Sequence, residues 1–213
     1  MYATGNMGNV PMLFRDGTVI PDRDLMEVYE DTENYNAVPI ILGTNRDEFK
    51  PFFIGDPNLI EMRMGVLPRI KNEPFFSAVT SYFNDSWKAR GVDEVSIQLN
   101  QSQGSNVYAY RFDWDELPTI LGADLSRLLG APHAFEIPFV FNSFDNSVMT
   151  SVLFSDNNIP SRDALASKMS SYWAEFAYTG SPGRGRNGKQ YEWRPWNPAV
   201  DAGKFVMLDG ERD

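Results

Sequence analysis

The sequence predicts an α/β fold in which a mostly parallel β-sheet is flanked by helices. Two short apolar runs, residues 38–44 and 107–114, have the composition of strands, and helical patterns precede the second run and follow it. A nearly continuous apolar run is typical of a strand that is covered on both faces, as in a parallel sheet. Helices that alternate with such strands along the chain indicate the α/β class.

The first part of the chain leads through a turn to the first strand. Asp16 and Gly17 precede a short apolar run, which favours a surface turn. An acidic, polar connection over 22–37 then leads to the strand at 38–44. Residues 51–72 are rich in methionine and proline and have no clean period, so we expect irregular structure with some helix there.

Two helical stretches separate the predicted strands. Asn72 is suited to cap a helix, with Pro74 in its first turn, and aromatic residues continue at helical spacing as far as Trp87. A second helical stretch covers about 92–103. The run "VYAYRFDW", residues 107–114, has an aromatic residue at every second position and predicts the second strand.

The last third of the chain contains a long loop, a helix and a short strand. The loop includes "GAPHAFEIPFVF", residues 130–141. Apolar residues at helical spacing predict a helix from Ser161, which we expect to end at Gly180 with Pro182 beyond it. Residues 204–208 form a candidate final strand.

The composition indicates one globular unit, or part of one. The chain has 213 residues, of which 42% are hydrophobic and 14% aromatic, which suffices for a core. Its formal net charge is −10, so we expect neither nucleic acid nor an anionic membrane as a partner. The absence of cysteine excludes disulfides and thiolate zinc sites but does not identify a compartment.

No segment has the composition of a membrane span or a signal peptide. No stretch approaches the roughly 20 apolar residues that a membrane span needs. Residues 1–12 have neither a basic start nor a long apolar core. We therefore expect a soluble chain of unknown localisation, with no signal peptide or transmembrane segment in these residues.

Two of the predicted strands are followed by groups that could act together in catalysis. Glu48 lies just beyond the first strand, and His133, the single histidine, lies beyond the second. Carboxyl ends of parallel strands meet at one edge of a sheet. There an imidazole and a carboxylate could supply the base and the acid of a nucleophile–His–acid triad. The order acid before histidine is that of α/β-hydrolases. For Asp47 we expect only a turn-shaping role.

Four segments together resemble the C-terminal portion of the type-B carboxylesterase family, which includes para-nitrobenzyl esterases and cholinesterases. The segments, in chain order, are residues 38–53, 107–114, 130–141 and 172–183. The resemblance runs from about Phe14 to the end of the chain. It implies an α/β-hydrolase fold, of which this chain would form the C-terminal part, and hydrolysis of a small-molecule carboxylic ester with no cofactor and no metal.

The resemblance also implies roles for individual residues. Glu48 in "GTNRDEF" corresponds to the triad acid, and His133 in "GAPHAFE" corresponds to the general base. Glu136 takes the acidic position after the histidine, where we expect it to support the histidine loop. Phe49 stands where the family usually has glycine. Phe52 and Phe53 follow closely and are candidates for lining the substrate pocket.

The nucleophile of such an esterase is missing from these residues. Neither the G-x-S-x-G elbow nor a Gly-Gly oxyanion loop occurs, and Ser105 and Ser181 fit turns better than catalysis. We therefore expect residues 1–213 to be the C-terminal portion of a single domain. The N-terminal part of the same enzyme would complete the site as a partner, and this chain alone would be inactive.

Two other interpretations remain open. The first is a non-catalytic, cholinesterase-like module for protein interaction. The second is a self-sufficient domain with an unrecognised nucleophile. The presence of both Glu48 and His133 disfavours the first, and the missing elbow disfavours the second.

Overall fold

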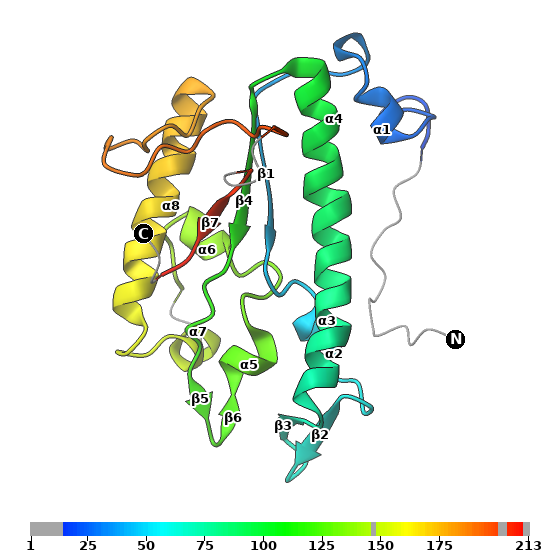
Figure 1. The fold of residues 1–213 in the computed structure, drawn as a ribbon. Coiled ribbons are helices and arrows are strands. Elements are labelled where there is room, and N and C mark those ends of the chain that lie inside the picture. The colour runs from blue at the N-terminus through cyan, green and yellow to red at the C-terminus, as the bar shows by residue number, and fades with distance from the viewer. Residues whose placement is uncertain (1–14, 146–147, 200–203, 211–213) are drawn as a thin grey trace.

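A parallel three-stranded sheet forms the centre of the protein, as Figure 1 shows. The computed structural model describes residues 15–145, 148–199 and 204–210. The strand order is β1-β4-β7, with bounds β1 (Ile40–Asn45), β4 (Val107–Phe112) and β7 (Val206–Leu208). In the register, Asn45 lies opposite Phe112, and Phe112 lies opposite Leu208. The predicted α/β class and all three predicted strands are confirmed.

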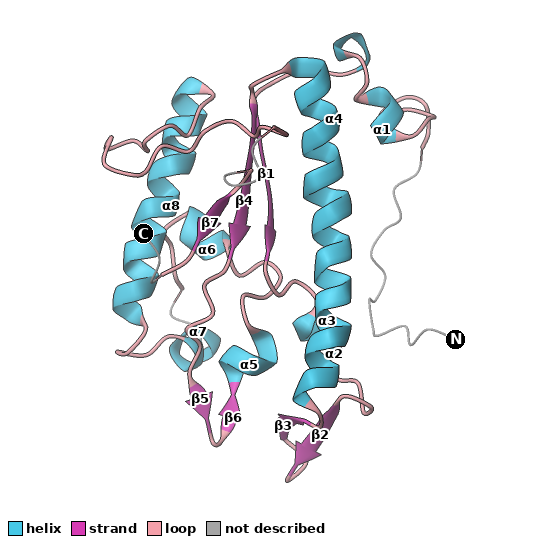
Figure 2. Ribbon diagram, viewed as in Figure 1, coloured by secondary structure: helices cyan, strands magenta, loops and turns pink. Residues whose placement is uncertain are grey.

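Long helices flank the sheet on two sides (Figure 2). The column on one side consists of α3 (Glu73–Lys88) and α4 (Glu94–Gln103), and α8 (Ile159–Thr179) runs along the other side. The Asn72 side chain accepts a hydrogen bond from the Phe75 N–H at 3.1 Å, which confirms the predicted cap. Gly180 ends α8 in the left-handed conformation, also as predicted.

The two predicted helices before β4 are joined rather than separate. A π-helical turn, Ala89–Asp93, connects them, and the Ala89 N–H still donates to the carbonyl of Asp85. The helical hydrogen bonding therefore continues through this point, and α3 and α4 form one continuous column (Figure 1). A single π-helical turn inside an α-helix is a π-bulge.

The prediction of irregular structure over 51–72 was wrong for part of that range. An antiparallel hairpin forms there from β2 (Ile60–Arg63) and β3 (Leu67–Ile70). Its turn contains Met64, a non-glycine residue at φ 51°, and β3 contains Pro68. Proline inside a strand and a turn without the usual Asn-Gly pair both weaken the hairpin pattern in the sequence.

Short elements occupy most of the remaining chain. They are α1 (Leu25–Val28), a 3₁₀ turn (Thr32–Asn34), α2 (Lys50–Phe53), β5 (Thr119–Ile120), β6 (Ala123–Asp124), α5 (Leu125–Leu129), α6 (Ile137–Val140) and α7 (Val148–Leu153). The sequence indicated α1 only as a polar connection. The elements from β5 to α6 lie in what the sequence indicated as a long loop.

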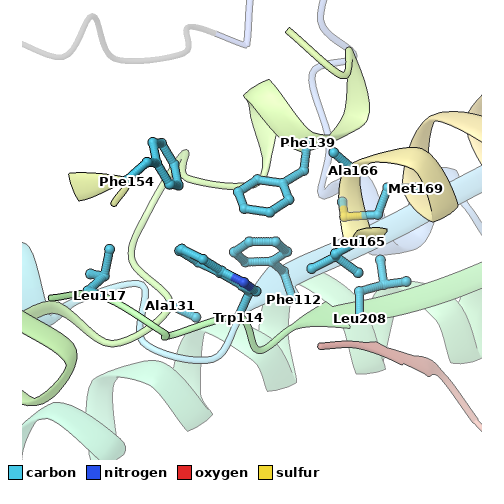
Figure 3. Packing of buried hydrophobic residues seen from close by; sticks show 10 residues of the cluster. All are labelled: Phe112, Trp114, Leu117, Ala131, Phe139, Phe154, Leu165, Ala166, Met169 and Leu208. Atoms are coloured by element: carbon cyan, nitrogen blue, oxygen red, sulfur yellow. The ribbon is translucent and has the colours of Figure 1, made fainter. Parts of the chain in front are cut away.

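The largest buried cluster anchors the loop that carries the histidine. Figure 3 shows its ten residues, which come from β4, β7, α6, α8 and the segments between them. Phe139 of α6 lies with its ring centroid 5.0 Å from Phe112 and 5.2 Å from Trp114. Ala131, two residues before His133, is completely buried in this cluster. Core packing at Ala131 therefore fixes the position of the loop that carries His133.

Across the described ranges, no helix combines the length and the hydropathy needed to cross a membrane. Residues 1–12, for which the sequence predicts no signal peptide, lie outside the described residues, as does Phe14, where the family resemblance begins.

Candidate active site

The end of β1 holds the Glu48 carboxylate by one of its two oxygens. Oε1 accepts hydrogen bonds from the Asn45 N–H at 2.8 Å and from the Thr44 hydroxyl at 3.2 Å. Glu48 is only 7% exposed. The backbone of the next residue is held by α3, where Asn84 Oδ1 accepts a hydrogen bond from the Phe49 N–H at 2.9 Å. The turn thus orients Glu48 and leaves its other oxygen, Oε2, for a different partner.

The partner of Oε2 is His133. Glu48 Oε2 and His133 Nδ1 lie 2.6 Å apart, although the two residues are 85 positions apart in the chain. The His133 side chain is 52% exposed, and its Nε2 has no hydrogen-bond partner among the described residues. A carboxylate at Nδ1 favours the tautomer with hydrogen on that nitrogen, which makes Nε2 the proton acceptor. The pair can therefore perform general base and acid chemistry at Nε2.

Asp47 ties the Glu48 turn to the histidine loop. Its N–H donates to the Ala131 carbonyl, and its Oδ2 accepts from the Ala131 N–H, both at 3.0 Å. Ion pairs with Arg46 at 2.9 Å and with Lys50 at 3.0 Å compensate its charge in a buried position. Asp47 thus does more than shape its own turn, which was all that the sequence indicated.

Asn45 and Glu136 form a second connection between the turn and the loop. Asn45 Nδ2 donates to the Pro132 carbonyl at 2.6 Å and to Glu136 Oε2 at 2.5 Å. Glu136 stands at the start of α6, but its side chain makes no capping hydrogen bond there. Asn45 was not identified from the sequence. The one available signal was its position as a polar residue at the end of an apolar strand.

Tyr110 lies near the carboxylates of Glu136 and Glu48. Burial raises the pKa of the Tyr110 hydroxyl, and the negative charges of Glu136 and Glu48 raise it further, so the tyrosine stays neutral at ordinary pH. Its ring lies across Gly43 of β1, where an added Cβ would come within 1.9 Å of the ring. Any side chain at position 43 would displace this tyrosine.

The aromatic residues after Glu48 divide into two groups. Phe49 has φ −94°, so a side chain at this position, where the family resemblance has glycine, causes no backbone strain. Phe52 is 42% exposed, and its ring centroid lies 5.9 Å from that of His133. Phe53 lies 5.3 Å from Phe83 instead and packs against a buried cluster. Of the two candidate pocket residues, Phe52 is thus the one beside the histidine.

The two serines considered from the sequence lie away from this pair in the topology. Ser105 precedes β4, at the opposite end of the strand from the histidine side. Ser181 follows the end of α8, and its N–H donates to the Thr179 hydroxyl at 3.2 Å. In the part of the chain that the structure describes, no group of three or more His, Asp and Glu side chains is arranged to hold a metal ion.

Comparison with known sequences identifies one family. The sequence model of the carboxylesterase family matches residues 56–209, a span that contains His133 but not Glu48. The para-nitrobenzyl esterase of Bacillus subtilis (strain 168) is 25% identical over 158 residues, which cover 69% of this chain and 30% of that protein. The acetylcholinesterase of Gallus gallus is 34% identical over 98 residues, which cover 46% of this chain and 11% of that protein.

Solved structures match over nearly the whole chain. The carboxylesterase Est55 of Geobacillus stearothermophilus at pH 6.8 has a TM-score of 0.61 and 23% identity, over 92% of this chain and 40% of that one. The protein EstA of Aspergillus niger has a TM-score of 0.60 and 21% identity, over 93% of this chain and 40% of that one. These likenesses show that the α/β fold is that of part of a carboxylesterase, an α/β-hydrolase. The chain spans less than half of the length of each of these relatives.

Proposed function

The chain belongs to the carboxylesterase family, and from that premise we propose that it supplies the histidine and the acid of a serine carboxylesterase. The observation that carries this proposal is the 2.6 Å contact between Glu48 Oε2 and His133 Nδ1 at the end of β1. The exposed half of the imidazole supports it, because a base needs access to its substrate.

Each residue has a defined step in the proposed reaction. His133 Nε2 takes the proton of a serine hydroxyl as the serine oxygen attacks the ester carbonyl, and then gives that proton to the departing alcohol. The same nitrogen next takes a proton from water, which attacks the acyl-serine, and returns it to the serine oxygen. Glu48 keeps the proton of the imidazole on Nδ1 and stabilises the imidazolium that forms in each step. No cofactor or metal takes part.

We propose that the nucleophilic serine and the oxyanion donors belong to a part of the enzyme outside residues 1–213. The G-x-S-x-G elbow does not occur in the sequence. Within the described residues β1 pairs with β4 alone, so its other edge is open to a further strand. Residues 1–213 would then be the C-terminal portion of one domain, inactive alone and completed by the N-terminal part of the same enzyme as its partner.

The proposed substrate is a small-molecule carboxylic ester. The names of two relatives, para-nitrobenzyl esterase and acetylcholinesterase, describe enzymes that act on esters. The position of Phe52 beside His133 supports a role in lining the substrate pocket. Phe53, the other candidate for the pocket, packs against Phe83, so we propose the smaller part for it. Glu136 would keep the histidine loop in place through its contact with Asn45.

A fusion protein tests this function. The segment of the B. subtilis esterase that precedes its match to this chain is joined to the chain, and kcat is measured on a chromogenic ester. We expect hydrolysis that falls by several orders of magnitude in His133→Ala and by roughly 10⁴-fold in Glu48→Gln. The exposed Glu30→Gln is the control and should leave kcat unchanged. Full activity of the His133→Ala fusion would contradict the proposal.

A further inference from the structure

We propose that Asn45 is a positioning residue that links the acid of this site to its base. Asn45 is the last residue of β1 and is only 2% exposed. It contacts Glu48 through its backbone and the loop around His133 through its side chain. The inference rests on the proposed function in so far as it concerns catalysis, but the contacts can be tested without any turnover.

The contact on the acid side orients the carboxylate. The Asn45 N–H donates to Glu48 Oε1 at 2.8 Å, which leaves Oε2 toward His133 Nδ1. A hydrogen bond from a backbone N–H to an ionised carboxylate is charge-assisted and stronger than a neutral one. The main chain of Asn45 therefore sets the position of the acid.

The contacts on the base side hold the histidine loop at two points. The Asn45 side-chain amide donates one hydrogen to the Pro132 carbonyl at 2.6 Å, directly before His133. Its other hydrogen goes to Glu136 Oε2 at 2.5 Å, three residues after the histidine. An amide NH₂ has two donors, and both are used here. An aspartate of the same size would place a carboxylate against the Pro132 carbonyl and the Glu136 carboxylate.

The backbone of the loop indicates why two contacts are needed. Ala134, the residue after His133, has φ 63°, in the left-handed region that residues with a Cβ rarely adopt. Such a conformation persists only where surrounding contacts impose it. Asn45 makes contacts on both sides of this residue, at Pro132 and at Glu136. Without its side chain, we expect the loop to relax and His133 Nδ1 to move away from Glu48.

The test uses the single histidine of the chain as a spectroscopic probe. In ¹⁵N-labelled chain, the ring nitrogen shifts report the tautomer, and the Nδ1 proton reports the Glu48 contact through its exchange rate with water. We expect exchange at least about tenfold faster in Asn45→Ala, together with a mixture of tautomers. A hydrogen-bonded proton exchanges when its bond opens, and a weakening of the contact by about 1.4 kcal/mol makes the open form tenfold more populated.

A matched control separates positioning from general stability. Asn158 is also buried, at 5% exposed, and its side-chain amide likewise donates two hydrogen bonds, in this case to the backbone carbonyls of Glu116 and Leu153. Asn158→Ala should therefore lower stability to a similar extent but leave the His133 signals unchanged. If Asn45→Ala does not fold, Glu136→Ala removes one of the two loop contacts and should speed exchange in the same direction.

The outcomes distinguish this inference from the proposed function. Unchanged tautomer and exchange in folded Asn45→Ala, or in Glu136→Ala if that variant has to replace it, would overturn the inference. Faster Nδ1 proton exchange and mixed tautomers in Asn45→Ala but not in Asn158→Ala would support the inference, even if the fusion enzyme is inactive. If the fusion is active, Asn45→Ala should lower kcat with little change in KM.

Discussion

At the scale of single residues, position 130 has no room for a side chain, because the Asp47 carboxylate occupies the space that a Cβ would take. Gly130 has φ +59°, and an added Cβ would lie 2.0 Å from Asp47 Oδ2. Gly188 has a similar φ of +68° with nothing within 4 Å, so Gly188→Ala measures the cost of the backbone conformation alone. We expect Gly188→Ala to cost about 1 kcal/mol of unfolding free energy.

For Gly130→Ala we expect about 2 kcal/mol more than for Gly188→Ala, because the methyl group must also displace a buried carboxylate. The midpoints of urea unfolding measure both variants. Equal losses would mean that the Asp47 contact with the loop can yield without cost. The NMR shifts of the His133 ring nitrogens should change in Gly130→Ala and stay the same in Gly188→Ala.

The residues of the site differ in how far the sequence can reveal them. Glu48 and His133 stand in recognisable local motifs, so the sequence alone suffices to propose their candidate roles. Asp47 and Asn45 act through contacts with a loop 84 and 87 residues away. A pattern of neighbouring residues carries no information about such pairings, so the sequence predicts no part for either residue in holding the histidine loop.

At the scale of elements, α2 has one exposed and one packed aromatic residue, and the two should behave differently. Phe53→Ala removes a ring that packs against Phe83 and should cost about 2 kcal/mol of stability. Phe52→Ala, at a 42% exposed position beside His133, should cost less than about 1 kcal/mol. In the fusion enzyme Phe52→Ala should instead raise KM for an aromatic ester. A raised KM in Phe53→Ala together with an unchanged KM in Phe52→Ala would contradict the proposed pocket.

A second prediction concerns α8, where burial raises the pKa of the Tyr172 hydroxyl to about 12, although Arg184 works against this shift. Tyr172 is 2% exposed and donates to the Tyr191 carbonyl at 2.7 Å. Above a pH of about 10 the unfolded chain loses this proton while the folded chain keeps it, so stability falls as pH rises toward 12. The expected loss from this group is roughly 2 kcal/mol.

Urea unfolding between about pH 9 and 12 measures that loss. Tyr172→Phe should show a shallower decline than the unmodified chain, although its stability at neutral pH is lower. Tyr191→Phe is the matched control, since it removes an exposed hydroxyl and keeps the carbonyl that Tyr172 uses. Parallel pH profiles for the unmodified chain and Tyr172→Phe would show that this hydroxyl does not titrate differently in the folded state.

Elements with strong local signals agree with their sequence predictions, and elements that depend on tertiary contacts do not. The start of α3 at Asn72 and the end of α8 at Gly180 follow from capping chemistry that is visible in the sequence. The β2–β3 hairpin depends on packing of Ile60 and Ile70 against α3 and α5, in spite of Pro68. That packing is non-local, so the local pattern predicted irregular structure.

At the scale of the whole molecule, the parallel sheet brings Glu48 and His133 to one edge. Both groups follow strands that run in the same direction, β1 and β4, and the loops after those strands gather at the same end of the sheet (Figure 1). The sheet has three strands in the described residues, and the chain covers 40% of each of the two carboxylesterase-like structures compared with it. We propose that the Glu48–His133 pair acts on a nucleophile from a part of the enzyme outside residues 1–213.

The most direct test is the intact mass of the purified chain after treatment with a serine-reactive fluorophosphonate. The chain is treated alone and together with the N-terminal portion of a related esterase, with His133→Ala as the control. We expect no adduct on this chain, and labelling of the added portion that depends on His133. A stoichiometric, His133-dependent adduct on this chain alone would show that it carries its own nucleophile and would contradict the proposal.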